Sequence, residues 1–316
     1  IYGLGKSGIS TYNFLRHKAQ INLFDDNPKN DTKFSNKRLN FNKILKSKFD
    51  FIIISPGIDF SKCRLSKYLK QNSSKIYTDL DVFCSFFSND SITITGTNGK
   101  STTAKLLYDV LRSQKKDARL VGNIGNPILS EKKISKKTFF VIEASSYQLD
   151  YSKIFKSKYS VILNITPDHI ERHKNFKNYI EAKFKLLDSQ SIQSVAFIKR
   201  NDPVIAKRLR SKKYKQKVIK IDTSLQPSFF SKIKNKYFMS SGNRENLIFV
   251  LKICKILSLN NKKTLKTINK FKGLKYRQQI IFDNNHLTII NDSKSTSLAS
   301  SENLLKNLKN VYWILC

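Results

Sequence analysis

The segment spanning residues 91–111 combines a predicted strand, a glycine-containing loop and a predicted helix. A run rich in β-branched residues (Ser91 to Thr95) leads into a loop that contains Gly96 and Gly99. Apolar residues then recur at helical spacing between positions 104 and 111. A strand that passes through a tight loop directly into a helix is typical of α/β folds, so this segment favours that fold class.

The same loop carries the residue types of a phosphate-binding site. Glycines let backbone N–H groups curl around a phosphate, and the helix N-terminus adds partial positive charge. Lys100 can reach the outer phosphates of a nucleotide, and the Ser101 hydroxyl can bind Mg²⁺. The full Walker A pattern has an outer glycine where this chain has Ile94. An ordinary tight turn is the alternative, but the strand, the lysine and the following hydroxyl residues favour a nucleoside triphosphate.

A second glycine pattern opens the chain. Gly3, Gly5 and Gly8 have the spacing G-x-G-x-x-G and precede a predicted helix. The next predicted strand ends in Asp25 and Asp26, and Asp25 lies 20 residues after Gly5. Dinucleotide-binding folds place an acidic ribose-binding residue at this distance. Taken alone, the segment is compatible with an NAD-dependent dehydrogenase or with a simple strand–helix turn.

Predicted strands and helices alternate along the chain, which implies a mostly parallel α/β sheet. The predicted strands are 21–24, 51–54, 91–95, 139–142, 159–163, 195–198, 286–290 and 311–316, and the predicted helices include 9–17, 100–111, 179–187 and 246–257. We expect a Rossmann-like N-terminal domain (1–78), a central parallel-sheet P-loop ATPase domain (79–273) and the start of a truncated Rossmann-like C-terminal domain (274–316). The chain opens and closes within apolar runs, so we expect a fragment truncated at both ends.

Composition narrows the class of protein further. The formal net charge is +36, but the lysines are spread along all 316 residues without a nucleic-acid-binding motif. We therefore favour a basic solvated surface over a nucleic-acid-binding module, which stays open as an alternative. No apolar run approaches the ~18 residues of a membrane helix. The four cysteines form no C-x-x-C pair, so we expect a reduced, cytoplasmic protein.

Polar residues follow the predicted strands of the central segment. Glu143 comes directly after strand 139–142, where a carboxylate can hold Mg²⁺ on a nucleotide; a helix-start glutamate without metal is the alternative. His169 and His173 lie four residues apart after the next strand, but no third zinc ligand has suitable spacing. We expect His169 near Mg²⁺ or phosphate and His173 at the surface. Lys183 carries no separate signal in so lysine-rich a chain.

In combination these motifs resemble the Mur ligase family of ATP-dependent, amide-bond-forming ligases, over nearly the whole chain. The matching stretches are 3–5, 55–58, 96–102, 122–125, 143–149, 164–172 and 291–294. The Glu-x-Ser-Ser-x-Gln-Leu and Asp-Ser-Lys elements most resemble the members that add D-glutamate to UDP-N-acetylmuramoyl-L-alanine. A folylpolyglutamate-type ligase is a weaker alternative, because that group lacks the glycine-rich first domain.

The resemblance implies roles for individual residues. It assigns ATP to Gly96, Thr97, Asn98, Gly99, Lys100, Ser101, Thr102, Asn246, Arg277 and Asp292, and two Mg²⁺ ions to Ser101, Glu143, His169 and a carbamylated Lys183. It assigns the UDP substrate to Gly5, Lys6, Ser7, Asp25, Asp26, Ser55, Gly57, Asn123, Ser145 and Gln148, and D-glutamate to Lys294 and Thr296. The catalytic set is Lys100, Glu143, His169 and Lys183.

The implied reaction is consistent with these residue types. ATP converts a carboxylate into an acyl phosphate, and the amine of D-glutamate then displaces phosphate. Two departures stand out: Gly242 replaces a histidine that is usual in the family, and Ser297 replaces an asparagine. We expect a cytoplasmic bacterial monomer in peptidoglycan synthesis, without membrane insertion or specific nucleic-acid binding, and little activity from these 316 residues alone.

Overall fold

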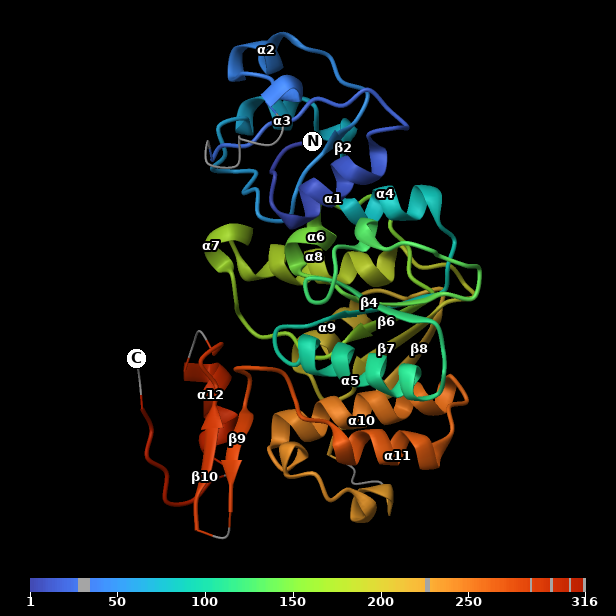
Figure 1. The fold of residues 1–316 in the computed structure, drawn as a ribbon, viewed down its shortest axis with the longest axis vertical. Coiled ribbons are helices and arrows are strands. Elements are labelled where there is room, and N and C mark those ends of the chain that lie inside the picture. The colour runs from blue at the N-terminus through green and yellow to red at the C-terminus, as the bar shows by residue number, and fades with distance from the viewer. Residues whose placement is uncertain (28–34, 225–227, 285, 296–297, 307, 315–316) are drawn as a thin grey trace.

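A computed structural model describes residues 1–27, 35–224, 228–284, 286–295, 298–306 and 308–314 of the chain. The fold is α/β, as predicted, and it contains three separate sheets (Figure 1). The first lies within residues 52–77, the second within 91–221 and the third within 279–291. Each sheet thus falls inside one of the three segments that the sequence suggests.

The first segment is built from short strands. Strands β1 (Ile52–Ile53) and β2 (Ile76–Tyr77) pair in parallel, and isolated parallel bridges join Tyr2 to Phe24 and Ile54. The predicted strand 21–24 is therefore reduced to single bridges, and the helix predicted at 9–17 begins earlier. The helices here are α1 (Lys6–Leu15), α2 (Phe41–Lys46) and α3 (Ser66–Gln71), with 3-10 turns at Ser35–Lys37 and Ser73–Lys75.

The central sheet has six parallel strands in the order β4-β5-β3-β6-β7-β8. The strands are β3 (Ser91–Thr95), β4 (Ala118–Gly122), β5 (Phe139–Glu143), β6 (Tyr159–Ile162), β7 (Val195–Lys199) and β8 (Lys217–Ile221). From β3 the chain first forms β4 and β5 on one side of that strand, and then β6, β7 and β8 on its other side. This topological switch point is where open α/β sheets bind ligands.

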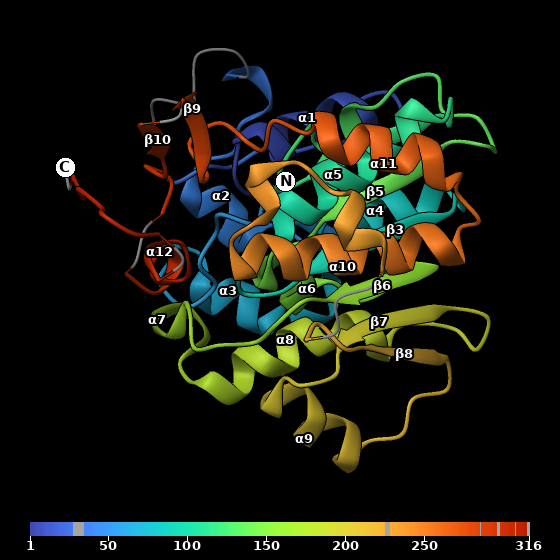
Figure 2. The ribbon, with the colours of Figure 1, turned by 90° about the horizontal axis from the view of Figure 1, so that it is seen from below.

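Helices cover both faces of this sheet (Figure 1 and Figure 2). One face packs against α4 (Asp79–Phe86), α6 (Ser146–Tyr151), α8 (Phe176–Asp188) and α9 (Pro203–Ser211), and the other against α5 (Lys100–Ser113), α10 (Ser241–Ile256) and α11 (Asn261–Lys270). The short helix α7 (Ile170–His173) follows β6, and 3-10 turns lie at Ile128–Ser130, Ser228–Lys232 and Lys236–Phe238. Alternate side chains feed two cores: Ile92 and Ile94 face α5, whereas Phe140 and Ile142 face α4 and α8.

The third segment is an antiparallel pair with one helix. Strands β9 (Gln279–Asp283) and β10 (Thr288–Asn291) precede α12 (Leu298–Leu305), which lies beside α10. The predicted terminal strand is wrong for its described part, because residues 311–314 have no regular secondary structure. They form no ladder with any described strand, and Tyr312 and Ile314 are 96% and 85% exposed. Without a partner strand, an apolar run has no reason to become extended sheet.

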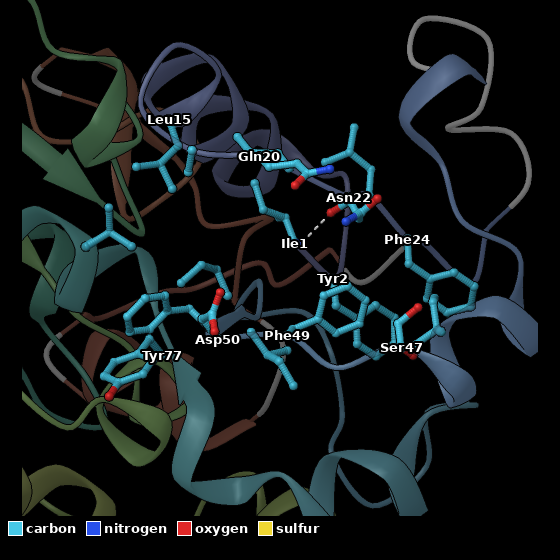
Figure 3. Close-up of a pocket in the computed structure, with 18 of the residues that line it drawn as sticks. Ile1, Tyr2, Leu15, Gln20, Asn22, Phe24, Ser47, Phe49, Asp50 and Tyr77 are labelled. Atoms are coloured by element: carbon cyan, nitrogen blue, oxygen red, sulfur yellow. Dashed lines mark hydrogen bonds between the residues drawn. The ribbon is translucent and has the colours of Figure 1, made fainter.

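A cavity of about 890 Å³ opens between the first segment and α4 (Figure 3). Its lining includes Ile1, Asn22 and Phe51, whereas the glycine loop follows Tyr2, which bridges Phe24 and Ile54. The backbone nitrogen of Ile1 donates to Asn22 O at 2.7 Å (Figure 3). Among the described residues, no helix is long and apolar enough to span a membrane.

Candidate active site

The phosphate loop lies at the switch point of the central sheet. Strand β3 is buried along its whole length and ends at Thr95; Gly96 follows it, and α5 begins at Lys100. Gly99 has a φ of +83°, a conformation that residues with a Cβ rarely adopt. A Cβ at this position would also lie 2.1 Å from Asn246 Oδ1, so α10 closes over the loop. Asn246, which the family resemblance assigns to ATP, therefore lies directly against the phosphate loop although it is distant in sequence.

Two lysines meet at this loop. Lys100 Nζ donates to Gly96 O at 2.9 Å and to Thr97 O at 2.7 Å. Lys183 Nζ donates to the same Gly96 carbonyl at 2.8 Å. Burial lowers the pKa of Lys100, which the charges of Glu143 and Asp168 partly oppose. Both amino groups thus occupy positions on the loop where a phosphate group would compete with backbone carbonyls.

Lys183 lies in a strongly desolvated position on α8. Its residue surface is 1% exposed, and its Nζ lies 4.5 Å from the ring centroid of Tyr179, one helical turn earlier. Tyr179 is in turn anchored to the loop, because its hydroxyl lies 3.0 Å from Thr97 Oγ1. Burial holds the pKa of Lys183 well below its usual value, and the Lys100 charge lowers it further. A lowered pKa favours the neutral amine, which is the nucleophilic form.

Glu143 has the surroundings of a metal ligand. It ends β5, next to β3, and is 1% exposed. Asn123 Nδ2 donates to its Oε1 at 2.8 Å, but its Oε2 is buried without a hydrogen-bond partner among the described residues. Buried carboxylate oxygens are normally paired or bound to a metal, so this orphaned atom fits Mg²⁺. Ser101, in the first turn of α5, supplies a second oxygen at the same edge of the sheet.

The two histidines after β6 point to different places. His169 is exposed on α7, with its Nε2 3.4 Å from Asp168 Oδ2. His173 is buried at 5% exposure, and its Nε2 lies 2.9 Å from Ser146 Oγ. Our expectation that His173 is at the surface is therefore wrong, because it fills the space between α6 and α8. The described part of the chain has no group of three His, Cys, Asp or Glu side chains that could hold a metal ion.

The Glu-x-Ser-Ser-x-Gln element has a local structural role. Ser145 and Gln148 form a capping box at the start of α6: Gln148 N donates to Ser145 Oγ, and Ser145 N donates to Gln148 Oε1 at 3.2 Å. Asp79 lies near them, since the side chains of Ser7 and Gln148 both act to lower the pKa of its carboxyl group. Burial nonetheless raises the pKa of Asp79. Asp79 therefore connects the first glycine loop to this element.

Of the three glycines in the pattern at the chain start, Gly3 and Gly8 are required by backbone conformation or close packing, and Gly5 is not. Gly3 has a φ of +94°, and a Cβ on Gly8 would lie 1.8 Å from Gly3 O. Ser55 Oγ donates to the same carbonyl at 2.7 Å. Gly5, by contrast, has open space around its Cβ position. The structure thus leaves Gly5 and the adjacent N-terminus of α1 accessible to a ligand.

Replacing Gly8 with alanine should destabilise the first segment. The added methyl group meets a backbone oxygen, so α1 must move away from the loop; overpacking of this kind costs about 1–3 kcal/mol. The free energy of unfolding from urea titration measures the change. Gly5→Ala is the matched control, with an expected cost of about 1 kcal/mol or less at this N-cap position. Equal effects of the two substitutions would contradict the steric argument.

Asp25 and Asp26, which follow the predicted strand 21–24, form most of their hydrogen bonds within the fold. Asp25 is 7% exposed and accepts hydrogen bonds from Leu4 N and Asn27 N. Asp26 accepts from the Tyr2 hydroxyl through one oxygen, while its Oδ1 is buried without a described hydrogen-bond partner. Asp25 therefore shapes the glycine loop as well as lying beside it. Lys6 and Gly57 are exposed at the same end of the segment.

The third segment supplies Arg277, Asp292 and Lys294 to the expected site, and its residue Gln278 hydrogen-bonds to the start of α10 through Ser240 and Asn243. Asp292 accepts from Gln278 N at 3.0 Å and from Ser301 Oγ at 3.2 Å, and the Arg277 charge contributes to the lowered pKa of Lys100. Lys294 is exposed, and Thr296 and Ser297 lie outside the described residues. Gly242, where the resemblance leads us to expect a histidine, has open space at its Cβ position.

Three contributors to this site escaped sequence-based assignment. Asn164 Oδ1 accepts from Asn98 N at 2.8 Å. The charge of Asp168 acts to raise the pKa of both Lys100 and Lys183. Arg172 donates a hydrogen bond to Pro56 O in the first segment. All three follow β6, which lies beside β3. The signal was available for Asn164, since the carboxyl ends of neighbouring parallel strands meet at one edge.

The fold and the site define a class: an α/β protein with a phosphate loop at the switch point of a parallel sheet and a second glycine loop in its first segment. Residues 94–264 match the family model described as Mur ligase middle domain. A UDP-N-acetylmuramoylalanine–D-glutamate ligase of Rickettsia bellii is 33% identical over 340 residues, covering 99% of this chain and 75% of the relative. A ligase of the same name from Rickettsia felis is 32% identical, covering 99% and 74%.

The chain belongs to the Mur ligase family. Its members are ATP-dependent ligases that form amide bonds. The fold agrees: the MurF ligase of Thermotoga maritima in complex with ADP superposes with a TM-score of 0.55 at 13% identity, covering 93% of this chain and 66% of that chain. The resemblance on which the sequence analysis relied is thereby confirmed at the level of family and fold.

Proposed function

We propose that this protein joins D-glutamate to UDP-N-acetylmuramoyl-L-alanine at the expense of ATP, in peptidoglycan synthesis. The observation that carries the proposal is the 33% identity with a ligase of that name over 99% of the chain. The geometry supports it, because Lys100, Lys183 and Glu143 gather at one phosphate loop. A carboxylate is a poor electrophile, and these groups suit its activation by phosphoryl transfer.

The reaction divides into two steps. A carboxylate oxygen of the alanyl group attacks the γ-phosphorus of ATP; the bond to the β-γ bridging oxygen breaks, leaving an acyl phosphate and ADP. The D-glutamate amine then attacks the acyl carbon, phosphate leaves, and the amine loses a proton. Lys100 and the N–H groups of the loop offset the charge that moves with the γ-phosphoryl group.

Four side chains would hold magnesium, of which Ser101, Glu143 and Lys183 are buried and His169 is exposed. We place one Mg²⁺ at Ser101 and Glu143 and a second at His169 and a carbamylated Lys183. When bound, the ions would supply positive charge against the triphosphate. Carbamylation would convert the Lys183 amine into an anionic oxygen ligand, which Mg²⁺ prefers to nitrogen. The buried, neutral-favouring environment of Lys183 supports that chemistry.

We assign the substrates as the family resemblance implies. The UDP substrate would lie at Gly5, Lys6, Ser7, Asp25, Asp26, Ser55, Gly57, Asn123, Ser145 and Gln148, and D-glutamate at Lys294 and Thr296. Thr97, Asn246, Arg277 and Asp292 would surround the nucleotide. We propose the three-domain division 1–78, 79–273 and 274–316, and a monomer in the cytoplasm.

Phosphate release tests this proposal. The full-length protein, given UDP-N-acetylmuramoyl-L-alanine, ATP and Mg²⁺, should release phosphate upon addition of D-glutamate and not of L-alanine, L-lysine or D-alanyl-D-alanine. Calorimetry of the 316-residue chain should detect the UDP substrate and no NAD. Release that does not depend on D-glutamate contradicts the substrate assignment. Tight DNA binding at physiological salt, with steep salt dependence, would instead favour the nucleic-acid alternative.

A further inference from the structure

The one-turn helix α7 connects the first segment with the phosphate loop. Its N-cap residue His169 and its C-cap residue Lys174 both have positive φ values, +53° and +71°. Non-glycine residues in such conformations persist only where surrounding contacts hold them. Strained residues at both ends therefore indicate that the position of α7 is fixed by what its side chains touch.

Arg172 of α7 holds the turn that follows β1. Its Nη2 donates to Pro56 O at 3.1 Å and to Ile58 O, and its Nη1 donates to Gly57 O at 3.4 Å. The guanidinium carbon lies 4.2 Å from the ring centroid of Tyr147. One side chain thus binds three consecutive carbonyls more than 110 residues away in sequence. Only a planar, multi-donor group can bind such a turn and stack on a ring together.

Ring contacts lead from α7 to Lys183 of α8, at the phosphate loop. The Tyr147 ring lies 5.1 Å from His169 and 5.5 Å from His173, and His173 lies 5.4 Å from Tyr179. Tyr179 carries Lys183 on its face at 4.5 Å. These contacts form a continuous column of rings from Arg172 to the Gly96 carbonyl. Displacement of the turn at 55–58 therefore has a packed path to Lys183.

We propose that Arg172 is a positioning residue that couples the turn 55–58 to the phosphate-loop cluster. The inference rests on the proposed function, in which that turn carries the UDP substrate. Arg172 fixes where the activated carboxylate enters the central segment, so its loss misplaces the reacting groups. Errors near 1 Å in such positioning cost about 10²-fold in rate.

Arg172→Lys in the full-length protein tests the coupling. Lysine keeps the charge and loses the three-carbonyl contact and the stacking. We expect kcat/KM for the UDP substrate to fall by about 10²-fold, through both a lower kcat and a higher KM, with KM for ATP within about 2-fold. Arg200→Lys is the matched control, since Arg200 is 56% exposed and pairs loosely with Asp222 at 3.8 Å. We expect no change there.

Hydrogen exchange of the backbone amides of residues 55–60 provides a readout that needs no catalysis. These amides should exchange faster in Arg172→Lys than in the wild type or in Arg200→Lys. If exchange in Arg172→Lys is unchanged, Arg172 does not hold the turn 55–58. If exchange is faster but kcat/KM for the UDP substrate is unchanged, the turn is not coupled to the phosphate-loop cluster. If the wild type releases no phosphate in response to D-glutamate, the proposed function is refuted, and the coupling of this turn to ligation with it. The exchange data still decide whether Arg172 holds the turn.

Discussion

Replacement of Lys183 by methionine should reduce D-glutamate-dependent phosphate release by about 10²–10³-fold or more, the cost of removing one preorganised electrostatic group. Methionine retains an unbranched apolar stem, so the packing under Tyr179 is kept and the fold should survive. The loss arises because no carbamate can form. Initial rates at saturating substrates measure the effect, and circular dichroism checks the fold.

The pH and CO₂ dependence of the wild type provide the matching control. A carbamate forms from the neutral amine, and burial holds the pKa of Lys183 well below its usual value. Activity and carbamate should therefore increase as pH rises through that lowered pKa, and bicarbonate should increase both. In ¹³CO₂, the wild type should show a carbamate resonance that Lys183→Met lacks. A fully active Lys183→Met variant, or the same resonance in it, contradicts the assignment.

Lys100→Met should have an effect of similar size on phosphoryl transfer, about 10²–10³-fold in kcat. Lys100 Nζ now donates to the carbonyls of Gly96 and Thr97, and a nucleotide would replace these weak partners with phosphate oxygens. Affinity for ATP should fall as well, which fluorescence titration with an ATP analogue can measure. The removal of this cation should also raise the pKa of Lys183, because the two charges repel each other.

Lys105→Met is the control for that substitution on the same helix. Lys105 pairs with Asp109 at 2.5 Å on the surface of α5, an i,i+4 pair worth about 0.2–0.5 kcal/mol. Its kcat and ATP affinity should match the wild type. Comparable losses in Lys100→Met and Lys105→Met would show that general positive charge, and not the loop position, matters.

Much of the site was predictable because the signals are local. The phosphate loop, Glu143 and Lys100 lie at the ends of strands or the start of a helix, and hydrophobic periodicity locates both. The capping box of Ser145 and Gln148 was also legible in the sequence as Ser-x-x-Gln before an apolar residue, although we read those residues only as substrate contacts.

Other features depend on contacts between distant segments. We expected His173 at the surface, yet Ser146 and Tyr179 enclose it. The run 311–314 was expected to be a strand because of its composition, but a strand needs a partner. The 21–24 strand was likewise reduced to bridges, since its pairing depends on Tyr2 and Arg38.

The sequence alone determined the α/β class, the phosphate loop and the family, since these depend on periodicity, glycine spacing and short motifs. The tertiary structure decided which charges meet. Lys183 is one of many lysines in the chain, and only the packing of α8 beneath β3 brings it to the Gly96 carbonyl and lowers its pKa. Desolvation and Coulomb interactions depend on distance in space, so the family resemblance could single out Lys183 but could not give its lowered pKa, and the order of residues did not reveal the reach of Arg172.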